Sequence, residues 1–398
     1  MTDVTVRELS AGANQQGVRA HNERLILSMI QRHGELPGSE LARRAGLSAQ
    51  TVSVILRALE AEGFIEKSTP QRGHVGKPRV PMKLRADAAY SVGLKIGRRN
   101  AALVLADFEG HEIEHWSINY PYPVPPDVLS FLKTGLGKVE ARLGPATSRI
   151  AGIGVARPHE LWEWPEAIGA PPEDLEAWRD FDIVAEIGAF SPLPVYLMND
   201  ATAACHAEQV FGRGREFRDY AYIYIGSFIG GGVVLNGTVF EGPHGNAGGF
   251  GPLPSFTEEK GEVQLLDVAS LYLLEAAMAR DDRDPQRLWT SNEDWSRDAD
   301  LVDAWVRSAA AHLGRAALTL VSVIDFEAVV IDGAFPADVR DALVRLTAEE
   351  MAKRDARSLI VPKIEAGSIG HRARELGAAT SPFFARYLLN TLGGFVAQ

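Results

Sequence analysis

Near the N-terminus, apolar residues recur at the spacing of short helices, and two apolar strands follow them. The first helical stripe consists of Leu25, Ile26, Met29 and Ile30, and a second begins at Leu41 and ends where Gly46 interrupts the helix. Ser48 stands where its hydroxyl can cap a third helix, whose buried face would be Val52, Ile55, Leu56 and Leu59. Three helices followed by a strand pair predict a winged helix-turn-helix.

The polar positions of the third helix indicate which residues would meet DNA. In a helix-turn-helix, the start of the second helix of the motif enters the major groove, where its side chains reach base edges. The candidate DNA-binding residues here are Ser48, Ala49, Gln50, Thr51, Ser53 and Arg57, with Ala49, Gln50 and Ser53 expected at bases and Arg57 at phosphate. The strands at 64–65 and 80–84 enclose a basic, glycine-containing tip, whose candidate DNA contacts are Arg72, Lys77 and Arg79.

Charge divides the chain into a basic segment and an acidic remainder. Residues 19–85 contain twelve Lys or Arg against six Glu, a net charge of +6, whereas residues 86–398 carry a net charge of −16. Attraction to phosphate acts over about 10 Å at ordinary salt, so the local charge matters more for DNA than the total of −11. A winged helix that binds protein through a basic surface is the alternative, but the polar helix start and the Gly/Arg tip together favour double-stranded DNA.

The rest of the chain alternates strand and helix patterns in two similar cycles. The first cycle predicts three strands between residues 90 and 120, then a helix at 127–143, a strand at 150–156, a helix at 181–190 and a strand ending at Asp200. The second predicts a helix at 201–213, a glycine-turned strand set at 220–242, helices at 265–280 and 300–323, and a strand at 328–332. Two α/β lobes of this kind hold a ligand in the cleft between them.

Composition limits which cell compartment and which cysteine chemistry we expect. The chain has no run of about 18 uncharged apolar residues, and its first residues lack the apolar centre of a signal peptide, so we expect a cytoplasmic protein with no membrane partner. Cys205 is the only cysteine, which excludes an intramolecular disulfide and a multi-cysteine zinc site. It lies in an Ala-rich helical pattern, where a buried thiol is expected.

Three segments of the body resemble the repressor, open reading frame and kinase (ROK) family in its transcription-regulator form. They are PVYLMNDATAACHAEQVFG at 194–212, YIYIGSFIGGGVVLNGTVFEGPHGNAGGFG at 222–251 and VIDFEAVVIDGA at 323–334. The resemblance implies an α/β fold class: an α+β winged helix-turn-helix, then a two-lobed actin/hexokinase-like body of ribonuclease H-type α/β lobes. The implied domains are a flexible tail at 1–17, the DNA-binding domain at 18–86, a first lobe at 87–199 plus about 378–398, and a second lobe at 200–377.

Sugar kinases of this family use the Asp of an Asn-Asp pair as general base on a sugar hydroxyl, and the matching residues are Asn199 and Asp200. The rest of the kinase set differs. The first phosphate turn, with Asp, Gly and Thr in the kinases, reads KIGRR at 95–99, so a cation replaces the carboxylate that organises the metal. Phe228 replaces a glycine of the second phosphate turn, GFGP at 249–252 replaces the Glu-x-Gly-His motif, and the zinc cysteines are missing. These departures predict no catalytic residue, no cofactor and no metal.

The resemblance places an effector cleft around Asn199 and Asp200, whose side chains can accept hydrogen bonds from hydroxyls. The other ligand candidates are His159, Trp162 or Trp164, and His244. Each has a structural alternative, because the Asn-Asp pair can cap the next helix, a tryptophan near a loop usually packs, and His244 lies in a turn. Lys95, Arg98 and Arg99 are expected at solvent or in salt bridges rather than on a phosphorylated sugar.

Together these inferences predict a homodimeric or larger transcription regulator of carbohydrate-related genes, a repressor rather than an activator. Its partners would be a palindromic DNA operator and a sugar, polyol or sugar-phosphate effector. Two alternatives stay open: a sugar kinase with an accessory DNA-binding domain, supported by Asp200 alone, and a DNA-binding scaffold whose cleft binds no ligand.

Overall fold

The computed structural model describes residues 15–69, 80–163, 169–290 and 294–389, which form two compact units. One unit contains the described residues up to Ala88 together with residues 385–389, and the other spans Ala89–Phe384. The described residues after position 384 therefore belong with the N-terminal domain, whereas the sequence analysis assigned them to the first lobe. The reason is that Leu388 and Leu389 contact the first helix, and these contacts cannot be predicted from the local sequence pattern.

The N-terminal unit is a winged helix-turn-helix, as predicted. Its elements are α1 (Gln15–His33), β1 (Glu35–Pro37), α2 (Gly38–Ala45), α3 (Ala49–Ala61), β2 (Ile65–Lys67) and β3 (Pro81–Leu84), with the strands in the order β1-β3-β2. Apolar side chains from all three helices form its core, including Ile26, Ile30, Leu41, Val52 and Leu59. Burial of these side chains holds α3 against the other two helices and leaves its opposite face exposed.

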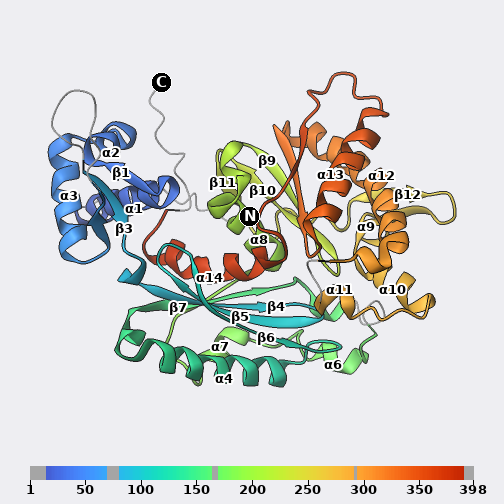
Figure 1. Ribbon diagram of the computed structural model, residues 1–398, viewed down its shortest axis with the longest axis horizontal. Coiled ribbons are helices and arrows are strands. Elements are labelled where there is room, and N and C mark those ends of the chain that lie inside the picture. The colour runs from blue at the N-terminus through green and yellow to red at the C-terminus, as the bar shows by residue number, and fades with distance from the viewer. Residues whose placement is uncertain (1–14, 70–79, 164–168, 291–293, 390–398) are drawn as a thin grey trace, which may run out of the picture. The chain divides into compact units, whose positions relative to one another are not determined.

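The first lobe of the second unit is built on a five-stranded mixed sheet. Its strand order is β6 (Glu112–Asn119), β5 (Asn100–Asp107), β4 (Tyr90–Ile96), β7 (Ile150–Arg157) and β8 (Val195–Asn199). The first three strands pair antiparallel, and β4, β7 and β8 pair parallel. Figure 1 shows α4 (Pro125–Leu143) and α7 (Ile183–Gly188) on one face of this sheet. Strand β8 ends at Asn199, opposite Arg157 of β7 and directly before α8 (Asp200–Phe211).

The second lobe repeats this arrangement. Its sheet has the order β11 (Thr238–Phe240), β10 (Ile229–Leu235), β9 (Tyr220–Ile225), β14 (Ala328–Gly333) and β15 (Lys363–Ala366), again with three antiparallel and then parallel strands. Its longer helices are α8 (Asp200–Phe211), α10 (Tyr272–Arg280), α12 (Ala299–Ile324) and α13 (Ala337–Ala352). Its shorter elements are β12 (Pro254–Thr257), β13 (Gly261–Gln264), α9 (Leu266–Ala269) and α11 (Arg287–Thr290), whereas α6 (Pro172–Glu176) belongs to the first lobe. The predicted repetition of two α/β cycles is confirmed.

Helix α14 (Ala373–Arg386) lies between the two sheets (Figure 1) and is fixed by backbone contacts that only glycine permits. A Cβ on Gly154 of β7 would stand 1.9 Å from the carbonyl oxygen of Ala378, and one on Gly377 would stand 1.8 Å from that of Ala203 in α8. The Ser91 hydroxyl of β4 also donates to the carbonyl of Ala379. Helix α14 is therefore held by elements of both lobes. No helix in the described ranges has both the length and the apolar character needed to cross a membrane.

Candidate DNA-binding helix and ligand pocket

The turn between α2 and α3 has the local chemistry that the sequence predicted. Gly46 ends α2 in the left-handed conformation, with φ of 65°, and Ser48 caps α3 by accepting a hydrogen bond from the Thr51 amide at 3.1 Å. Val52, Ile55 and Leu59 of α3 are buried, while Leu56 is only half-buried. The turn and the core together set the orientation of the exposed face of α3.

Four exposed side chains of α3 form a stripe at helical spacing: Gln50, Ser53, Val54 and Arg57. The predicted Ala49 is also exposed, at the first position of the helix. Gln50, Ser53 and Arg57 were predicted DNA contacts, and their common face supports that hypothesis. Val54 was not predicted, although it is 50% exposed in the middle of the stripe. An exposed valine at this place offers an apolar contact to a thymine methyl group.

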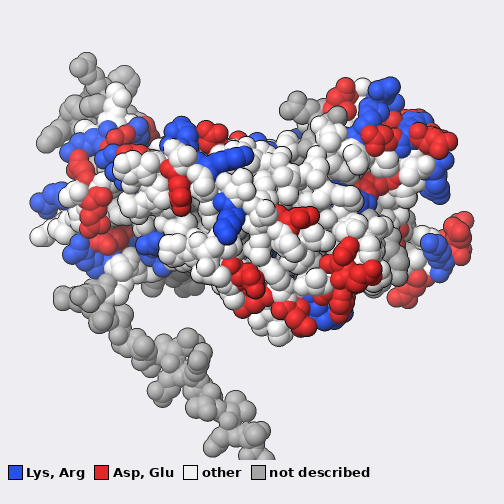
Figure 2. All heavy atoms as spheres, turned by 90° about the horizontal axis from the view of Figure 1, so that it is seen from below, with Lys and Arg blue, Asp and Glu red and all other residues white. Residues whose placement is uncertain are grey.

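Much of the basic charge of this unit is balanced by acidic neighbours. Arg43 and Arg44 both contact Glu40, Lys67 contacts Glu60, and Figure 2 shows Lys and Arg lying beside Asp and Glu across the visible face. Arg57 has no ion pair within the described ranges, and its Nε donates to the backbone oxygen of Ser53 at 3.1 Å. The predicted wing contacts Arg72, Lys77 and Arg79 lie outside the described residues. The charge of Arg57 is therefore not balanced by an ion pair within the described ranges.

The C-terminal end of the described chain packs on the winged helix. Arg24 Nε of α1 donates to the Leu388 oxygen at 3.0 Å, and the Leu389 amide donates to the Ser28 hydroxyl at 2.7 Å. The rings of Phe64 and Tyr387 lie 5.2 Å apart between centroids. The residues that follow α14 are thus bound to the DNA-binding unit through both backbone and side chains.

A pocket of about 170 Å³ lies between the two lobes, where the sequence placed the effector cleft. The predicted residues His159, Asn199 and Asp200 line it. Asn199 also caps α8, because its side-chain oxygen accepts hydrogen bonds from the Ala201 amide at 2.9 Å and the Thr202 amide at 3.2 Å. The structural alternative for Asn199 is therefore realised, and its amide nitrogen is the part of the side chain left for a ligand.

Asp200 is buried and bound to a residue that the sequence analysis did not single out. Arg374, in the first turn of α14, places its Nη1 3.0 Å from the Asp200 carboxylate, and its guanidinium lies over the Tyr224 ring at 5.0 Å. Arg374 and Tyr224 both line the pocket. The carboxylate that resembles a catalytic base is thus half of a buried ion pair, which favours a binding role over proton transfer.

The altered phosphate turns fill the space next to this ion pair. The Arg98 guanidinium stacks on Phe228, 4.0 Å from the ring centroid, and both residues line the pocket. Arg99 of the same turn contacts Glu275 at 2.8 Å, as the salt-bridge alternative predicted. Lys95 is buried and donates to the side chain and the backbone oxygen of Asn100. Arg98 and Phe228 therefore fill the space beside the Asp200–Arg374 ion pair, whereas Arg99 and Lys95 are bound to other protein groups.

Burial and neighbouring charge change the titration of these cations. The pKa of Lys95 is lowered to about 7, mainly by burial and also by the positive charge of Arg374, while Glu375 and Asp200 oppose the shift. Burial likewise lowers the pKa of Arg98 to about 10, while the Asp200 carboxylate opposes this shift. The cationic forms of Lys95 and Arg98 are thus disfavoured in the folded protein and lack full compensation from carboxylates.

The replacement Lys95→Met is expected to stabilise the body by on the order of 2 kcal/mol near pH 6. The folded pKa of about 7 lies below the ordinary value of 10.5, so the cost of burying the ammonium is complete below pH 7 and disappears as pH rises toward 10.5. Urea unfolding of both proteins at pH 6 and pH 10 should show a gain that shrinks with pH. The exposed Lys260→Met is the control, and an equal gain at both pH values would contradict the burial argument.

The predicted ligand contacts Trp162 and His244 do not line the pocket. The Trp162 ring packs beside the core under the Arg179 guanidinium at 5.3 Å, and Trp164 lies outside the described residues. His244 is exposed in a turn between Gly242 and Gly245, both with positive φ, and does not line the pocket. The neighbouring Asn246 lines it instead.

The glycines that resemble a phosphate-binding turn are explained by packing. A Cβ on Gly231 would stand 2.1 Å from the Tyr222 oxygen, and one on Gly232 would stand 2.6 Å from the Cys205 sulfur. One on Gly248 would stand 2.5 Å from Gly232 Cα. These glycines therefore serve the close approach of β10 to α8 and to the following loop. Their presence does not by itself indicate a nucleotide.

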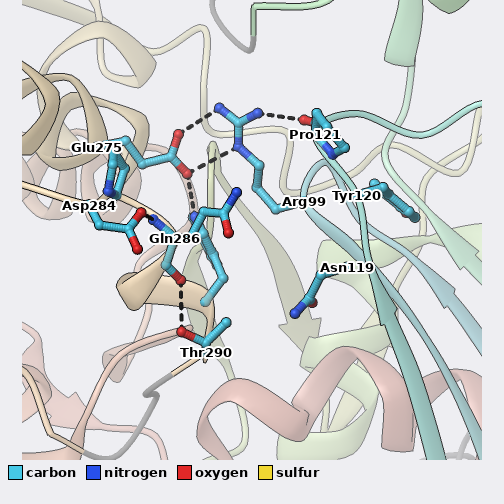
Figure 3. A pocket seen from close by; sticks show the side chains of 10 residues that line it. Arg99, Asn119, Tyr120, Pro121, Glu275, Asp284, Gln286 and Thr290 are labelled. Atoms are coloured by element: carbon cyan, nitrogen blue, oxygen red, sulfur yellow. Dashed lines mark hydrogen bonds and ion pairs between the residues drawn. The ribbon is translucent and has the colours of Figure 1, made fainter.

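A larger pocket, of about 410 Å³, lies at the mouth between the lobes and is lined from both of them (Figure 3). Arg99 of the first lobe binds Glu275 of α10 and donates to the Pro121 oxygen at 2.6 Å, while Trp289 Nε1 donates to Glu275 at 2.5 Å. These contacts tie the first lobe to α10 and α11 of the second. Opening of the lobes would have to break them.

One group of side chains has the spacing of a metal site, at the turn between β5 and β6. Asp107, Glu109 and His111 bring one ligand atom each within 4.8 Å of the others. The Asp107 carboxylate already accepts hydrogen bonds from the backbone amides of Glu109 and His111, at 3.0 and 2.9 Å. The cluster is therefore explained as the cap of a tight turn.

The fold defines a class of protein: a winged helix-turn-helix DNA-binding domain joined to a two-lobed, actin/hexokinase-like body. The ROK family model matches residues 91–381, and a winged helix-turn-helix DNA-binding model matches residues 19–66. The chain belongs to the ROK family, and it is a transcriptional regulator of that family with a DNA-binding winged helix.

Individual relatives agree with this assignment. The uncharacterized protein y4fQ of Sinorhizobium fredii is 25% identical over 92% of this chain and 91% of its own length. The xylose repressor of Bacillus subtilis is 26% identical over 60% of this chain, which spans 62% of the repressor's length. The crystal structure of a ROK family transcriptional regulator, a homologue of the E. coli MLC protein, matches with a TM-score of 0.65 and 21% identity, covering 91% of this chain and 95% of that one. The crystal structure of a ROK family glucokinase from Streptomyces griseus also matches, with a TM-score of 0.55 and 20% identity, covering 73% of this chain and 98% of that one.

Proposed function

We propose that this protein represses genes for carbohydrate uptake or use, and that a carbohydrate-like effector bound between the lobes releases it from its operator. One combination carries the proposal: a capped recognition helix with an exposed polar stripe stands in the same chain as a pocket lined by Asn199 and Asp200. The similarity to a xylose repressor supports the carbohydrate link. A pocket of about 170 Å³ suits a monosaccharide-sized ligand, since larger ligands occupy roughly 300–1,000 Å³.

The proposed mechanism is a shift between two conformations of a homodimer. Two winged helices must present their recognition helices about 34 Å apart to read a palindrome, so a small rotation of the lobes misplaces one of them. The Arg99–Glu275 ion pair crosses the lobes and would be part of any such rotation. The ligand moves the equilibrium only as far as its affinities for the two conformations differ.

Helix α14 offers a direct physical route from the pocket to the DNA-binding unit. Its first turn carries Arg374, which binds Asp200 in the pocket, and its last residue is followed by Tyr387, Leu388 and Leu389 on the winged helix. A ligand that displaces Arg374 would act on one continuous helix whose end is fixed to α1. We therefore assign α14 the role of transmitting effector binding.

The replacement Tyr387→Ala is expected to reduce the effect of the inducing sugar on operator occupancy by about fivefold or more, because it removes the ring contact with Phe64. Operator affinity without inducer should stay close to wild type, since α3 is untouched. A reporter gene behind the operator measures both values. Phe256→Ala, at an exposed aromatic of β12, is the control, and full induction in the Tyr387 variant would exclude this route.

Selection of genomic DNA fragments by the purified protein, followed by sequencing, tests the regulator itself. We expect a palindrome near carbohydrate transport or catabolic genes. Enrichment no greater than for random DNA would reject sequence-specific regulation and favour a scaffold role.

We infer further that the body is not an active kinase. Phe228 and Arg98 stack where a nucleotide phosphate would lie, and Asp200 is held by Arg374. The alternative of a sugar kinase with an accessory DNA-binding domain rests on Asp200 and on the family relationship with kinases. It predicts phosphate transfer from ATP to a sugar at high protein concentration, and we expect none.

A further inference from the structure

The floor of the interlobe pocket contains hydrogen-bond donors that have nothing to donate to. Nε of Arg98, Nε of Arg374 and the Tyr224 hydroxyl are each fully covered and have no hydrogen-bond partner among the described residues. Arg374 is 8% exposed and Tyr224 2% exposed, and all three side chains line the pocket. Buried donors are nearly always satisfied in folded proteins, so three unsatisfied donors at one place point to a missing acceptor.

The positive charge at this floor is also not fully balanced by carboxylates, which favours an anionic ligand. Asp200 lies 3.0 Å from Arg374, and Arg98 has no carboxylate within 4.0 Å in the described ranges. Arg98 instead faces the π-electrons of Phe228, which hold the guanidinium in place without neutralising it. A neutral hydroxyl could accept the hydrogen bonds, but only an anion would also supply the missing charge.

The remaining polar groups of the pocket suit the rest of such a ligand. The carboxylates of Glu160 and Glu163 belong to exposed or half-buried side chains, so water screens them. Together with Asn246 and His159 they offer hydrogen-bond partners for hydroxyl groups. The pocket thus combines a buried cationic floor with other side chains suited to hydroxyls.

We infer that the effector is a polyhydroxylated acid whose carboxylate or phosphate group binds Arg98, Arg374 and the Tyr224 hydroxyl at the pocket floor. This inference rests on the proposed effector-sensing function and specifies the chemical class of the effector. It also gives a reason for the altered sequence of the turn at Lys95 to Arg99. The resemblance places a metal-organising carboxylate of the kinases in this turn, whereas here the turn supplies the Arg98 guanidinium to the pocket. Binding of the acid at Arg374 competes with or reorganises the Asp200 ion pair at the start of α14.

The test compares acids with their neutral counterparts on the full-length protein. The probes are glucose, glucitol, gluconate, glucuronate and glucose 6-phosphate, with inorganic phosphate as the minimal oxyanion, and the readouts are thermal shift and calorimetric affinity. We expect at least one acid to raise the melting temperature by several degrees and its neutral counterpart to have little effect. Comparing the affinity for gluconate or glucuronate with the affinity for glucose 6-phosphate shows whether the bound anion is a carboxylate or a phosphate.

Two variants locate the anion. Tyr224→Phe removes only an unpaired hydroxyl, so its fold should be as stable as wild type while the affinity for the acid falls about tenfold. Arg98→Gln should abolish the preference for the acid over the neutral compound. Arg99→Gln is the matched control, since this neighbour contacts Glu275 in the other pocket and should leave the preference unchanged.

Neutral compounds binding as tightly as acids, or an unchanged acid preference in Arg98→Gln, would overturn the inference and leave the effector function intact. Absence of binding by every probe, inorganic phosphate included, would overturn it as well. The regulator function fails separately, through absence of operator enrichment by the protein without ligand, so the two failures are distinguishable.

Discussion

Replacing Asp200 with alanine is expected to lower the free energy of unfolding of the body by about 3–5 kcal/mol, because it leaves buried guanidinium groups without the carboxylate that Arg374 contacts. The pKa of Arg98 is lowered to about 10, mainly by burial, and the Asp200 carboxylate opposes this shift while the charge of Arg374 adds to it. Chemical unfolding monitored by circular dichroism measures the loss. Glu258→Ala, at an exposed carboxylate of the same lobe, is the control and should change little.

A double-mutant cycle separates this ion pair from other effects of the substitution. Arg374→Met alone should also destabilise the body, whereas Asp200→Ala combined with Arg374→Met should recover part of the loss, since no buried charge of the pair is then left. A double variant whose loss equals the sum of the single losses would contradict the coupling. If Asp200 were a catalytic base instead, its removal would change turnover and leave stability nearly unaffected.

Replacing both Gln50 and Ser53 with alanine is expected to weaken operator binding by about 2–4 kcal/mol, roughly 30- to 1,000-fold, while binding to random DNA changes little. These side chains share the exposed stripe of α3 with Arg57, at a helix start capped by Ser48. The affinities for operator and for scrambled fragments, measured at one fixed salt concentration, give the ratio of specific to non-specific binding. Equal weakening on both fragments would show that these residues do not read bases.

Arg57→Ala provides the contrasting variant for the same helix. If Arg57 contacts phosphate, its loss should weaken binding to both fragments equally. The slope of log affinity against log salt concentration should then become shallower by about one unit. Val54→Ala should lower affinity only for operators with a thymine at one position, since the valine would contact its methyl group. The three variants together show which residues of the exposed stripe contact bases and which contact phosphate.

The local patterns that predicted the DNA-binding domain and the two lobes depend on neighbours in sequence. Ser48 caps α3 and Gly46 ends α2 because backbone hydrogen bonding near a helix end involves residues only a few positions apart. The alternation of strands and helices likewise gave both sheets, because apolar periodicity reports which face of each element is buried. The altered phosphate turn at 95–99 was visible as a loss of small residues.

The partners of the pocket residues depend on contacts between distant positions. Asp200 and Arg374 are 174 residues apart, and nothing in the α14 sequence distinguishes Arg374 from the other cations of the chain. The glycines of β10 resembled a phosphate turn, but their neighbours show that they permit close packing against α8 and a loop. Trp162 and His244 were plausible ligand contacts whose positions away from the pocket no local pattern encodes.

The sequence by itself determined the helices of the winged helix-turn-helix and the two α/β lobes, because these follow from short-range periodicity and capping. Only the tertiary structure decided that Asn199 caps α8, that Asp200 binds Arg374, and that the residues after α14 contact the winged helix. The physical reason is that charge pairing and burial are set by which side chains meet in space. The floor of the pocket, with its unsatisfied donors from β4–β5, β9 and α14, exists only once those elements are packed together.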